Sequence, residues 1–413
     1  MESARLIAGL TRVVRDVGLA EELAQDALLA ALETWPEQGV PDNPGAWLMT
    51  TAKRRGIDQL RRHKRVTRKH EELGHELEDD ASADREGALR KLDEKLDDAV
   101  GDDLLRLLFI ACHPVLSMEG RAALTLRLLG GLSTDEIARA FLVPEPTVAQ
   151  RIVRAKRTLA EAAVAFELPS GAELAERLSS VLAVIYLIFN EGYSATAGDD
   201  LMRPTLCEDA LRLGRILGEL AADEPEVHGL LALMELQASR EKARVGPSGE
   251  AILLLAQNRG RWDQLLIRRG LAALERAQAL GGFGGFYALQ AAIAACHATA
   301  RTAEQTDWQR IAALYAVLSD LTQSPIVELN RAVAVSMAHG AAAGLEIIDE
   351  LQAEPVLASY HLLPSVRGDL LEKLGRVGEA AVEFERAASL TKNEREREVL
   401  LGRAATCRAR PER

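Results

Sequence analysis

The side chains with the clearest chemical potential lie in residues 133–159. Apolar residues at 148, 152, 155 and 159 follow steps of four, three and four, which predicts a helix with one buried face. The opposite face carries Thr147, Gln150, Arg151 and Arg154, with Lys156 and Arg157 beyond them. Gln and Arg can hydrogen-bond base edges in the major groove of DNA. This pattern therefore predicts a DNA-reading face.

The residues before this face predict the elements that position it. Ser133 and Glu136 form a capping box, so we expect a first helix that ends near Phe141. The segment "LVPEP" supplies a short turn, and Pro146 suits the first turn of the second helix. An ordinary helical hairpin with a solvated basic face is the alternative. The capping box, the turn length and the acid-free outer face favour a helix-turn-helix that enters the major groove.

A second basic segment, residues 53–69, stands out in a chain of formal net charge −12. Nine of its residues are Lys or Arg, and only Asp58 opposes them. We expect a helix from near Trp47 into this run, with the basic side chains on a DNA-facing surface. Local positive charge of this kind attracts the phosphate backbone even when the whole protein is acidic.

Residues 19–35 predict a third functional helix with the opposite charge. Small apolar residues form a narrow seam, and acidic or amide side chains lie largely outside it. These side chains are Glu21, Glu22, Gln25 and Asp26. From the residues alone, a solvated acidic face is the simpler interpretation.

The segments "LAEELAQDALLAAL" and "AWLMTTAKRRGIDQLRR", followed by the helix-turn-helix, resemble the bacterial extracytoplasmic-function (ECF) sigma factors of the sigma-70 family. The resemblance covers about residues 1–165. It implies that core RNA polymerase is bound by Glu21, Glu22, Gln25 and Asp26. It implies that the −10 promoter element is contacted by Trp47, Thr50, Arg54, Arg61, Arg62 and Arg65. It implies that the −35 element is contacted by Thr147, Gln150, Arg151, Arg154 and Arg157.

Composition and charge predict an all-α chain with several parts. Ala and Leu recur, aromatic residues make up 4%, and we find no convincing strand. The run 104–117 is apolar enough for a strand, but its length and context favour a buried helix ending near Pro114. We expect a first domain at 1–70, an acidic linker at 71–103, a helix-turn-helix domain at 104–165 and a helical extension at 166–413.

The extension resembles the helical, tetratricopeptide-like (TPR-like) domain of one subgroup of these factors. Residues 361–390 place Gly368, Leu374, Gly375, Ala380, Phe384 and Ala387 at tetratricopeptide-type positions. A looser copy begins near Ile326. Several repeats are needed for a stable stack, so a plain helical bundle stays open as an alternative.

Other candidate chemistry is weaker. "FNEGYSA" at 189–195 could bind a ligand or supply an acid and a base, but a helix ending at Gly192 with local bonding explains it more simply. "GGFGGF" at 281–286 does not follow a strand, so it predicts a flexible turn between helices. The four cysteines lie far apart, which predicts buried thiols. We expect no metal, no cofactor and no catalytic residue.

The leading hypothesis is a cytoplasmic sigma factor whose partners are core RNA polymerase and promoter DNA. Its extension would regulate it in cis or bind a protein or small-molecule ligand. The alternative is a helix-turn-helix regulator with a TPR-like sensor domain that acts without polymerase. That alternative leaves the two N-terminal motifs unexplained. An enzyme built around "FNEGY" is a third hypothesis.

Overall fold

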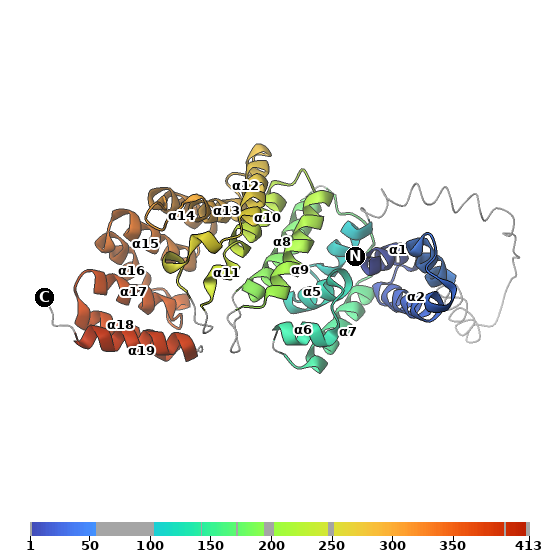
Figure 1. Cartoon of the computed structure of the whole chain (residues 1–413), viewed down its shortest axis with the longest axis horizontal. Helices are drawn as coiled ribbons and strands as arrows, with labels where there is room; N and C mark the ends of the chain where they lie inside the picture. Colours follow the sequence, from blue (N-terminus) through green and yellow to red (C-terminus); the bar gives the residue numbers. More distant parts are fainter. Residues whose placement is uncertain are drawn as a thin grey trace, which may run out of the picture. The chain divides into compact units, whose positions relative to one another are not determined.

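A computed structural model describes residues 2–54, 103–141, 143–170, 172–193, 202–246, 252–391 and 394–409. These residues form helices and no β-strand, as the sequence predicts (Figure 1). They divide into two compact units, Met1–Ile188 and Phe189–Arg413. None of the described helices is both long enough and apolar enough to span a membrane.

Unit 1 contains the N-terminal helices and the helix-turn-helix. Helices at 44–54 and 103–111 accompany the other elements of this unit. Those elements are α1 (Glu2–Val14), α2 (Val17–Gln38), α5 (Met118–Thr125), the π-helix η1 (Leu126–Gly130), α6 (Thr134–Phe141), α7 (Glu145–Glu161) and most of α8 (Ala172–Tyr193). The acidic segment 71–102 lies outside the described residues.

Two N-terminal helices are longer than the sequence predicts. The Asp16 side chain accepts a hydrogen bond from Leu19 N at 2.8 Å, so α2 begins at Val17 and includes Pro36 in its last turn. Asn43 accepts a hydrogen bond from Ala46 N at 3.0 Å and caps the helix at 44–54. Of the breaker-rich segment 36–45, only residues 39–43 therefore connect the two capped helices.

The first part of α8 is built into unit 1. Arg177 Nη2 donates to the Phe109 carbonyl at 3.2 Å, and Ser180 Oγ donates to the Cys112 carbonyl at 2.6 Å. Arg121 Nη1 donates to Ser180 Oγ at 3.0 Å. The division between the units thus falls within α8, at Ile188, rather than at the expected end of the helix-turn-helix domain.

Helix α10 forms the centre of the first half of unit 2. It packs against α9, α12 and α13, and its buried residues lie on all sides of the helix. A helix that is apolar all round is expected to be enclosed by others. The elements here are α9 (Pro204–Leu220), α10 (Pro225–Ala238), α11 (Glu241–Arg244), η2 (Leu254–Ala256), η3 (Arg259–Arg261), α12 (Gln264–Ala279) and α13 (Phe286–Thr299).

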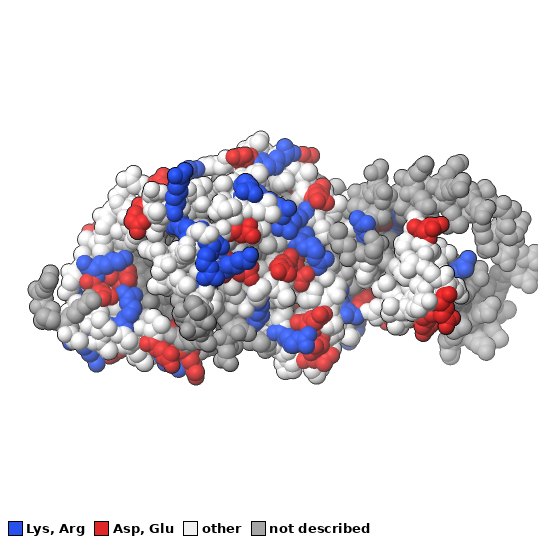
Figure 2. Space-filling model, in the orientation of Figure 1, with Lys and Arg blue, Asp and Glu red and all other residues white. Residues whose placement is uncertain are grey.

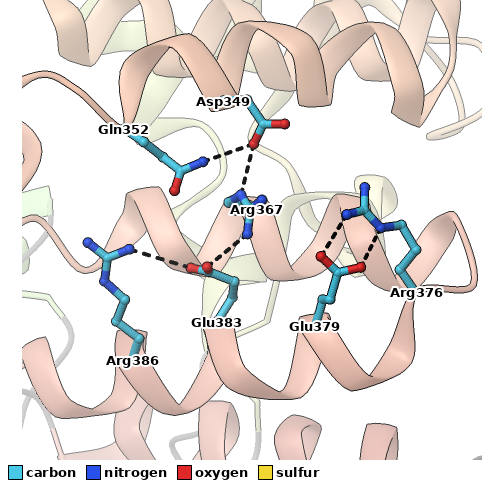
Figure 3. Close-up of polar contacts among 7 residues, drawn as sticks. All are labelled: Asp349, Gln352, Arg367, Arg376, Glu379, Glu383 and Arg386. Carbon is cyan, nitrogen blue, oxygen red and sulfur yellow. Dashed lines mark hydrogen bonds and ion pairs between the residues drawn. The ribbon is translucent and has the colours of Figure 1, made fainter.

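The second half of unit 2 is a succession of helices in which each contacts the next, as Figure 1 shows. They are α14 (Trp308–Thr322), α15 (Pro325–His339), α16 (Ala341–Leu351), η4 (Pro355–Leu357), α17 (Leu362–Lys373), α18 (Val377–Leu390) and α19 (Glu394–Ala409). Gly368 lets α17 approach Phe384 of α18, because a Cβ atom there would lie 2.8 Å from Phe384 Cε1. Arg367 joins three helices by donating to Asp349 and Glu383, each at 2.9 Å (Figure 3).

Candidate nucleic-acid interface

The structure contains the expected helix-turn-helix. Ser133 Oγ accepts from Glu136 N at 3.2 Å, and Ser133 N donates to Glu136 Oε2 at 2.7 Å, which completes the capping box. These hydrogen bonds hold the pKa of Glu136 below its ordinary value. Pro146 lies in the first turn of α7. Both predicted helix starts are confirmed to within a residue or two.

Helix α7 has one buried face and one accessible face. Its buried side chains are Val148, Ile152, Ala155 and Leu159, the four residues of the predicted apolar stripe. On the other face Gln150 and Arg154 are exposed, and Thr147 and Arg151 are half-buried. Arg157 lies 3.3 Å from Glu161, and both side chains are largely exposed. A helix of this length presents about 25 Å of surface, which suits the major groove.

The second predicted DNA surface is described only in its first part. The Trp47 ring meets Trp35 edge to face, with ring centroids 5.5 Å apart, so the indole is fixed at the start of the helix at 44–54. Thr50 is half-buried and Arg54 is exposed. Burial and the charge of Arg12 lower the pKa of Lys53. The predicted contacts Arg61, Arg62 and Arg65 lie outside the described residues.

Four side chains predicted to contact core polymerase lie on α2 in two different environments. Glu22, Gln25 and Asp26 are exposed. Glu21 is only 5% exposed, and the π-helix η1 and α7 supply its two cationic partners. This difference within one short motif was not expected from the sequence.

The Glu21 carboxylate joins three elements of unit 1. Its Oε1 atom accepts from Arg127 Nε at 2.7 Å and from Gln25 Nε2 at 2.9 Å. Its Oε2 atom lies 2.6 Å from Lys156 Nζ in an ion pair without hydrogen-bond alignment. We call the Glu21, Arg127 and Lys156 side chains the interdomain triad, because they connect α2 to η1 and α7.

Another ion pair joins the same regions. Arg12 Nη1 of α1 lies 3.2 Å from Asp103 Oδ2, and the Asp103 side chain is 3% exposed. Asp103 also accepts from Arg106 Nη1 at 2.8 Å. Asp103 therefore belongs to the helix at 103–111 rather than to the acidic linker. The N-terminal region and the helix-turn-helix are held together by polar contacts as well as by packing of α1 on η1.

The other motifs have structural partners. Glu191 pairs with Arg203, and the Tyr193 ring lies 3.7 Å from the Arg244 guanidinium carbon. Helix α8 continues through Gly192 to Tyr193, one residue beyond the expected end. Gly192 allows close packing, because a Cβ atom there would lie 2.7 Å from Cys207 N.

The glycine-rich turn at 281–286 permits a helix cap. Glu226 accepts from Tyr287 N at 2.9 Å and from Ala288 N at 3.3 Å, at the N-terminus of α13. A Cβ atom at Gly285 would lie 2.0 Å from Glu226 Oε1, so a larger residue would displace the carboxylate. The four cysteines are buried and free, as predicted, and burial raises the pKa of Cys112 to about 12. Within the described ranges, no group of three or more His, Cys, Asp or Glu side chains could hold a metal ion.

Comparison with known families separates the same parts of the chain. The model of Sigma-70 region 2 matches residues 2–66, and that of Sigma-70, region 4 matches residues 106–159. A family of unknown function, DUF6596, matches residues 177–278. The first two matches cover α2, the helix at 44–54 and the helix-turn-helix.

Individual relatives agree with these matches. An uncharacterized protein of Rhizobium meliloti, R00370, is 44% identical over 389 residues, which are 94% of this chain and 89% of that protein. The ECF RNA polymerase sigma factor SigK of Mycobacterium ulcerans is 28% identical over 156 residues, 38% of this chain and 78% of SigK. SigK of Mycobacterium sp. strain KMS is 35% identical over 75 residues, 17% of this chain and 37% of that protein.

Proposed function

Because the chain belongs to the ECF sigma factors of the sigma-70 family and carries a large C-terminal extension, we propose that it binds core RNA polymerase and directs it to specific promoters. In this role it needs no catalytic residue of its own, since the polymerase performs nucleotidyl transfer.

The observation that carries the proposal is the two-sided character of α7. Its apolar stripe is buried against the rest of unit 1, while Gln150 and Arg154 are exposed on the face that a major groove would meet. Exposed Gln and Arg side chains on one face can each make paired hydrogen bonds to a base. We assign −35 contact to Thr147, Gln150, Arg151, Arg154 and Arg157.

Contact with the −10 element is assigned to the helix that begins at residue 44. The fixed Trp47 indole offers a stacking surface, and Arg54 offers an exposed charge for phosphate. Thr50 lies between them in the sequence. The assignment extends to Arg61, Arg62 and Arg65 on the family resemblance alone.

Polymerase contact is assigned to α2, and it requires unit 1 to open. Glu22, Gln25 and Asp26 are accessible in the described state, but Glu21 is enclosed by Arg127 and Lys156. The −35 and −10 elements are separated by about 25 base pairs, or roughly 85 Å of duplex at 3.4 Å per base pair. Two DNA-reading parts in direct contact cannot reach both elements. We therefore infer that the described state is closed and that the interdomain triad breaks on promoter binding.

The extension is proposed to regulate this opening. Its first helix, α8, bonds to the carbonyls of Phe109 and Cys112 through Arg177 and Ser180, so it takes part in the unit that reads DNA. The consecutive packing of α14 to α19 and the close Gly368–Phe384 contact support a TPR-like arrangement. Repeats of this kind commonly present an extended binding surface.

Run-off transcription with purified core polymerase tests the proposal. We expect the protein to bind core polymerase and to produce a transcript that starts at a defined promoter. A helix-turn-helix regulator that acts without polymerase would bind DNA but would neither bind core nor direct a start site. That result would replace the sigma assignment with the alternative.

A double substitution tests the −35 assignment. Arg151→Ala with Arg154→Ala should weaken promoter binding by about 1–3 kcal/mol per lost base contact and leave core binding intact. The matched control is Arg268→Ala with Arg269→Ala, which truncates two adjacent exposed arginines of α12 in unit 2. Equal loss of promoter binding in both double variants would contradict the assignment.

A further inference from the structure

Unit 2 contains a cavity of about 260 Å³ between α10, α13, α14 and α15. Leu233, Leu236 and Leu318 are buried and line its interior, while Asn330 is exposed and lines its edge. A cavity of about 150 Å³ lined by apolar side chains is large enough to bind benzene. The space is therefore sufficient for a compound of one ring or of about eight carbon atoms.

One cationic side chain lines this cavity, and no acidic one is among its described lining residues. That side chain is Arg240, which directly precedes α11. In its hydrogen bonds to described residues, Arg240 donates from Nη2 to the Tyr193 hydroxyl and to Gln237 Oε1. Its guanidinium carbon lies 5.8 Å from the ring centroids of both Tyr193 and Trp262. The guanidinium is thus held in place through one nitrogen, while Nε and Nη1 remain able to donate to a ligand.

A second arginine adds positive charge beside the cavity. Arg259 donates to the carbonyls of His297 and Ala300 and to Thr306 Oγ1, and its guanidinium carbon lies 4.9 Å from the Trp262 ring centroid. Among the described residues, neither Arg240 nor Arg259 forms an ion pair with a carboxylate. Figure 2 shows a group of basic side chains on the surface over the α11 region, with acidic side chains beside them.

The electrostatic consequence is visible at His297, which lines the same cavity. Burial, and then the charges of Arg240 and Arg259, lower the pKa of His297 to about 4. The imidazole is therefore neutral near pH 7, and its ring meets Trp308 edge to face at 5.2 Å. The exposed Glu304 carboxylate opposes part of the Arg259 charge, whereas Arg240 has no ion pair with a carboxylate of the described residues, so the environment of the cavity favours a negative charge near Arg240.

We propose that this cavity binds a small organic anion, with its negative group against Arg240 and its apolar body against Leu233, Leu236 and Leu318. Charge-assisted hydrogen bonds from an oriented guanidinium are strong and directional, so Arg240 would select for the anionic group. Buried leucines would contribute affinity in proportion to the apolar surface that the ligand covers. The proposal goes beyond the sigma role, and its binding test needs neither polymerase nor DNA.

Tryptophan fluorescence of the full-length protein provides the assay, with octanoate as the probe. Trp262 lies beside both arginines and Trp308 beside His297, so an occupied cavity should change the emission. We expect a saturable change with octanoate. Octanamide, which has the same tail without the charge, should bind at least about tenfold more weakly, and acetate, which lacks the tail, should also bind at least about tenfold more weakly.

Two variants separate the charge from the space. Arg240→Gln should remove the preference for octanoate over octanamide, whereas Ala294→Leu should weaken both ligands by filling part of the lining. Arg276→Gln is the matched control, because Arg276 is a half-exposed arginine of unit 2 outside the cavity lining. Thermal melts establish whether each variant is folded. If the Arg240→Gln protein does not fold, the Ala294→Leu protein still tests whether the ligand occupies this cavity.

Specific results would overturn the proposal. Absence of a saturable octanoate signal in the wild-type protein excludes an organic-anion site here. Equal affinity for octanoate and octanamide would show that Arg240 does not select for a negative charge. Equal affinity for octanoate and acetate would show that the apolar lining does not contribute to binding. A folded Arg240→Gln or Ala294→Leu protein that binds octanoate as the wild type does would place the ligand elsewhere.

Discussion

The interdomain triad makes a direct prediction for the substitution Glu21→Gln. The change keeps the size of the side chain but removes the charge that faces Arg127 and Lys156. Both cations then lose their carboxylate, while the packing of α1 on η1 does not involve the substituted side chain. We expect unit 1 to open more often, with the N-terminal helices separating from the helix-turn-helix.

The structure sets the size of the effect. Removing one member of a fully buried ion pair costs about 3–5 kcal/mol. The Arg127 and Lys156 side chains are 24% and 23% exposed, so water can solvate them and the cost falls to about 1–3 kcal/mol. A change of about 2 kcal/mol multiplies the ratio of open to closed molecules by roughly 30.

Single-molecule energy transfer measures this ratio. Dyes attached through Leu29→Cys on α2 and Val153→Cys on α7 would report the separation, because these side chains are 57% and 65% exposed. The four natural cysteines are buried and should react slowly with the dyes. We expect the population with low transfer efficiency to increase in the Glu21→Gln protein.

Glu22→Gln is the matched control, because it removes an exposed carboxylate from the adjacent residue. It should leave the distribution of transfer efficiencies as in the wild type. If Glu21→Gln and Glu22→Gln give the same distribution while both proteins stay folded, the triad does not hold the closed state. A double-substitution cycle that combines Glu21→Gln with Arg127→Gln measures the coupling energy between these two side chains.

Three further predictions concern unit 2. Gly368→Ala should destabilise the protein by about 1–3 kcal/mol in urea unfolding, because the new Cβ atom would lie 2.8 Å from the buried Phe384 ring. Gly402→Ala is the control: its new Cβ atom would have no neighbour within 4 Å, so it should stabilise the protein by up to about 1 kcal/mol. Glu226→Ala should cost about 1–2 kcal/mol in the same assay, because the N-terminal amides of α13 lose their acceptor. Burial and two neighbouring arginines lower the pKa of His297 to about 4. The contribution of His297 to stability is therefore complete above the unfolded-state pKa near 6.5 and is lost as the pH falls toward 4. When the free energy of unfolding is measured from pH 7 to pH 4, His297→Phe should reduce its decrease by up to about 3 kcal/mol.

Features determined by local sequence were predictable. The capping box at Ser133 and Glu136, the position of Pro146 and the four-residue apolar stripe of α7 are confirmed, because each depends on residues within about three helical turns. The all-α class is confirmed for the same reason. Helix ends that depend on a single capping side chain, as at Asp16 and Asn43, were placed less accurately.

Features determined by tertiary packing were not predictable. Glu21 looks like its neighbours Glu22 and Asp26 in the sequence, and its partner Arg127 is 106 residues away. The cavity in unit 2 is lined by residues of four helices that are separated in the sequence, so no local sequence pattern predicts it. The division of the chain within α8 depends on the hydrogen bonds of Arg177 and Ser180, whose acceptors are each 68 residues away.

Glu21 has two proposed roles that oppose each other. On the family resemblance it contacts core polymerase, and in the closed state the same carboxylate holds Arg127 and Lys156. Polymerase must therefore displace the two cations to use Glu21, and the free energy of that exchange reduces the apparent affinity of the closed protein. Glu21→Gln changes both roles together, so its effect on polymerase binding has no predetermined sign.

Lys156→Gln separates the two roles, because Lys156 belongs to the triad but lies on α7 rather than on the proposed polymerase surface. It should weaken the closed state by about 1 kcal/mol, keep the Glu21 carboxylate and raise the apparent affinity for core polymerase by roughly fivefold. A pull-down titration of core polymerase with the wild type and this variant measures the change. If Lys156→Gln opens unit 1 and leaves polymerase affinity unchanged, closure and polymerase binding are independent, and Glu21 is a structural residue of unit 1 rather than a contact shared between two states.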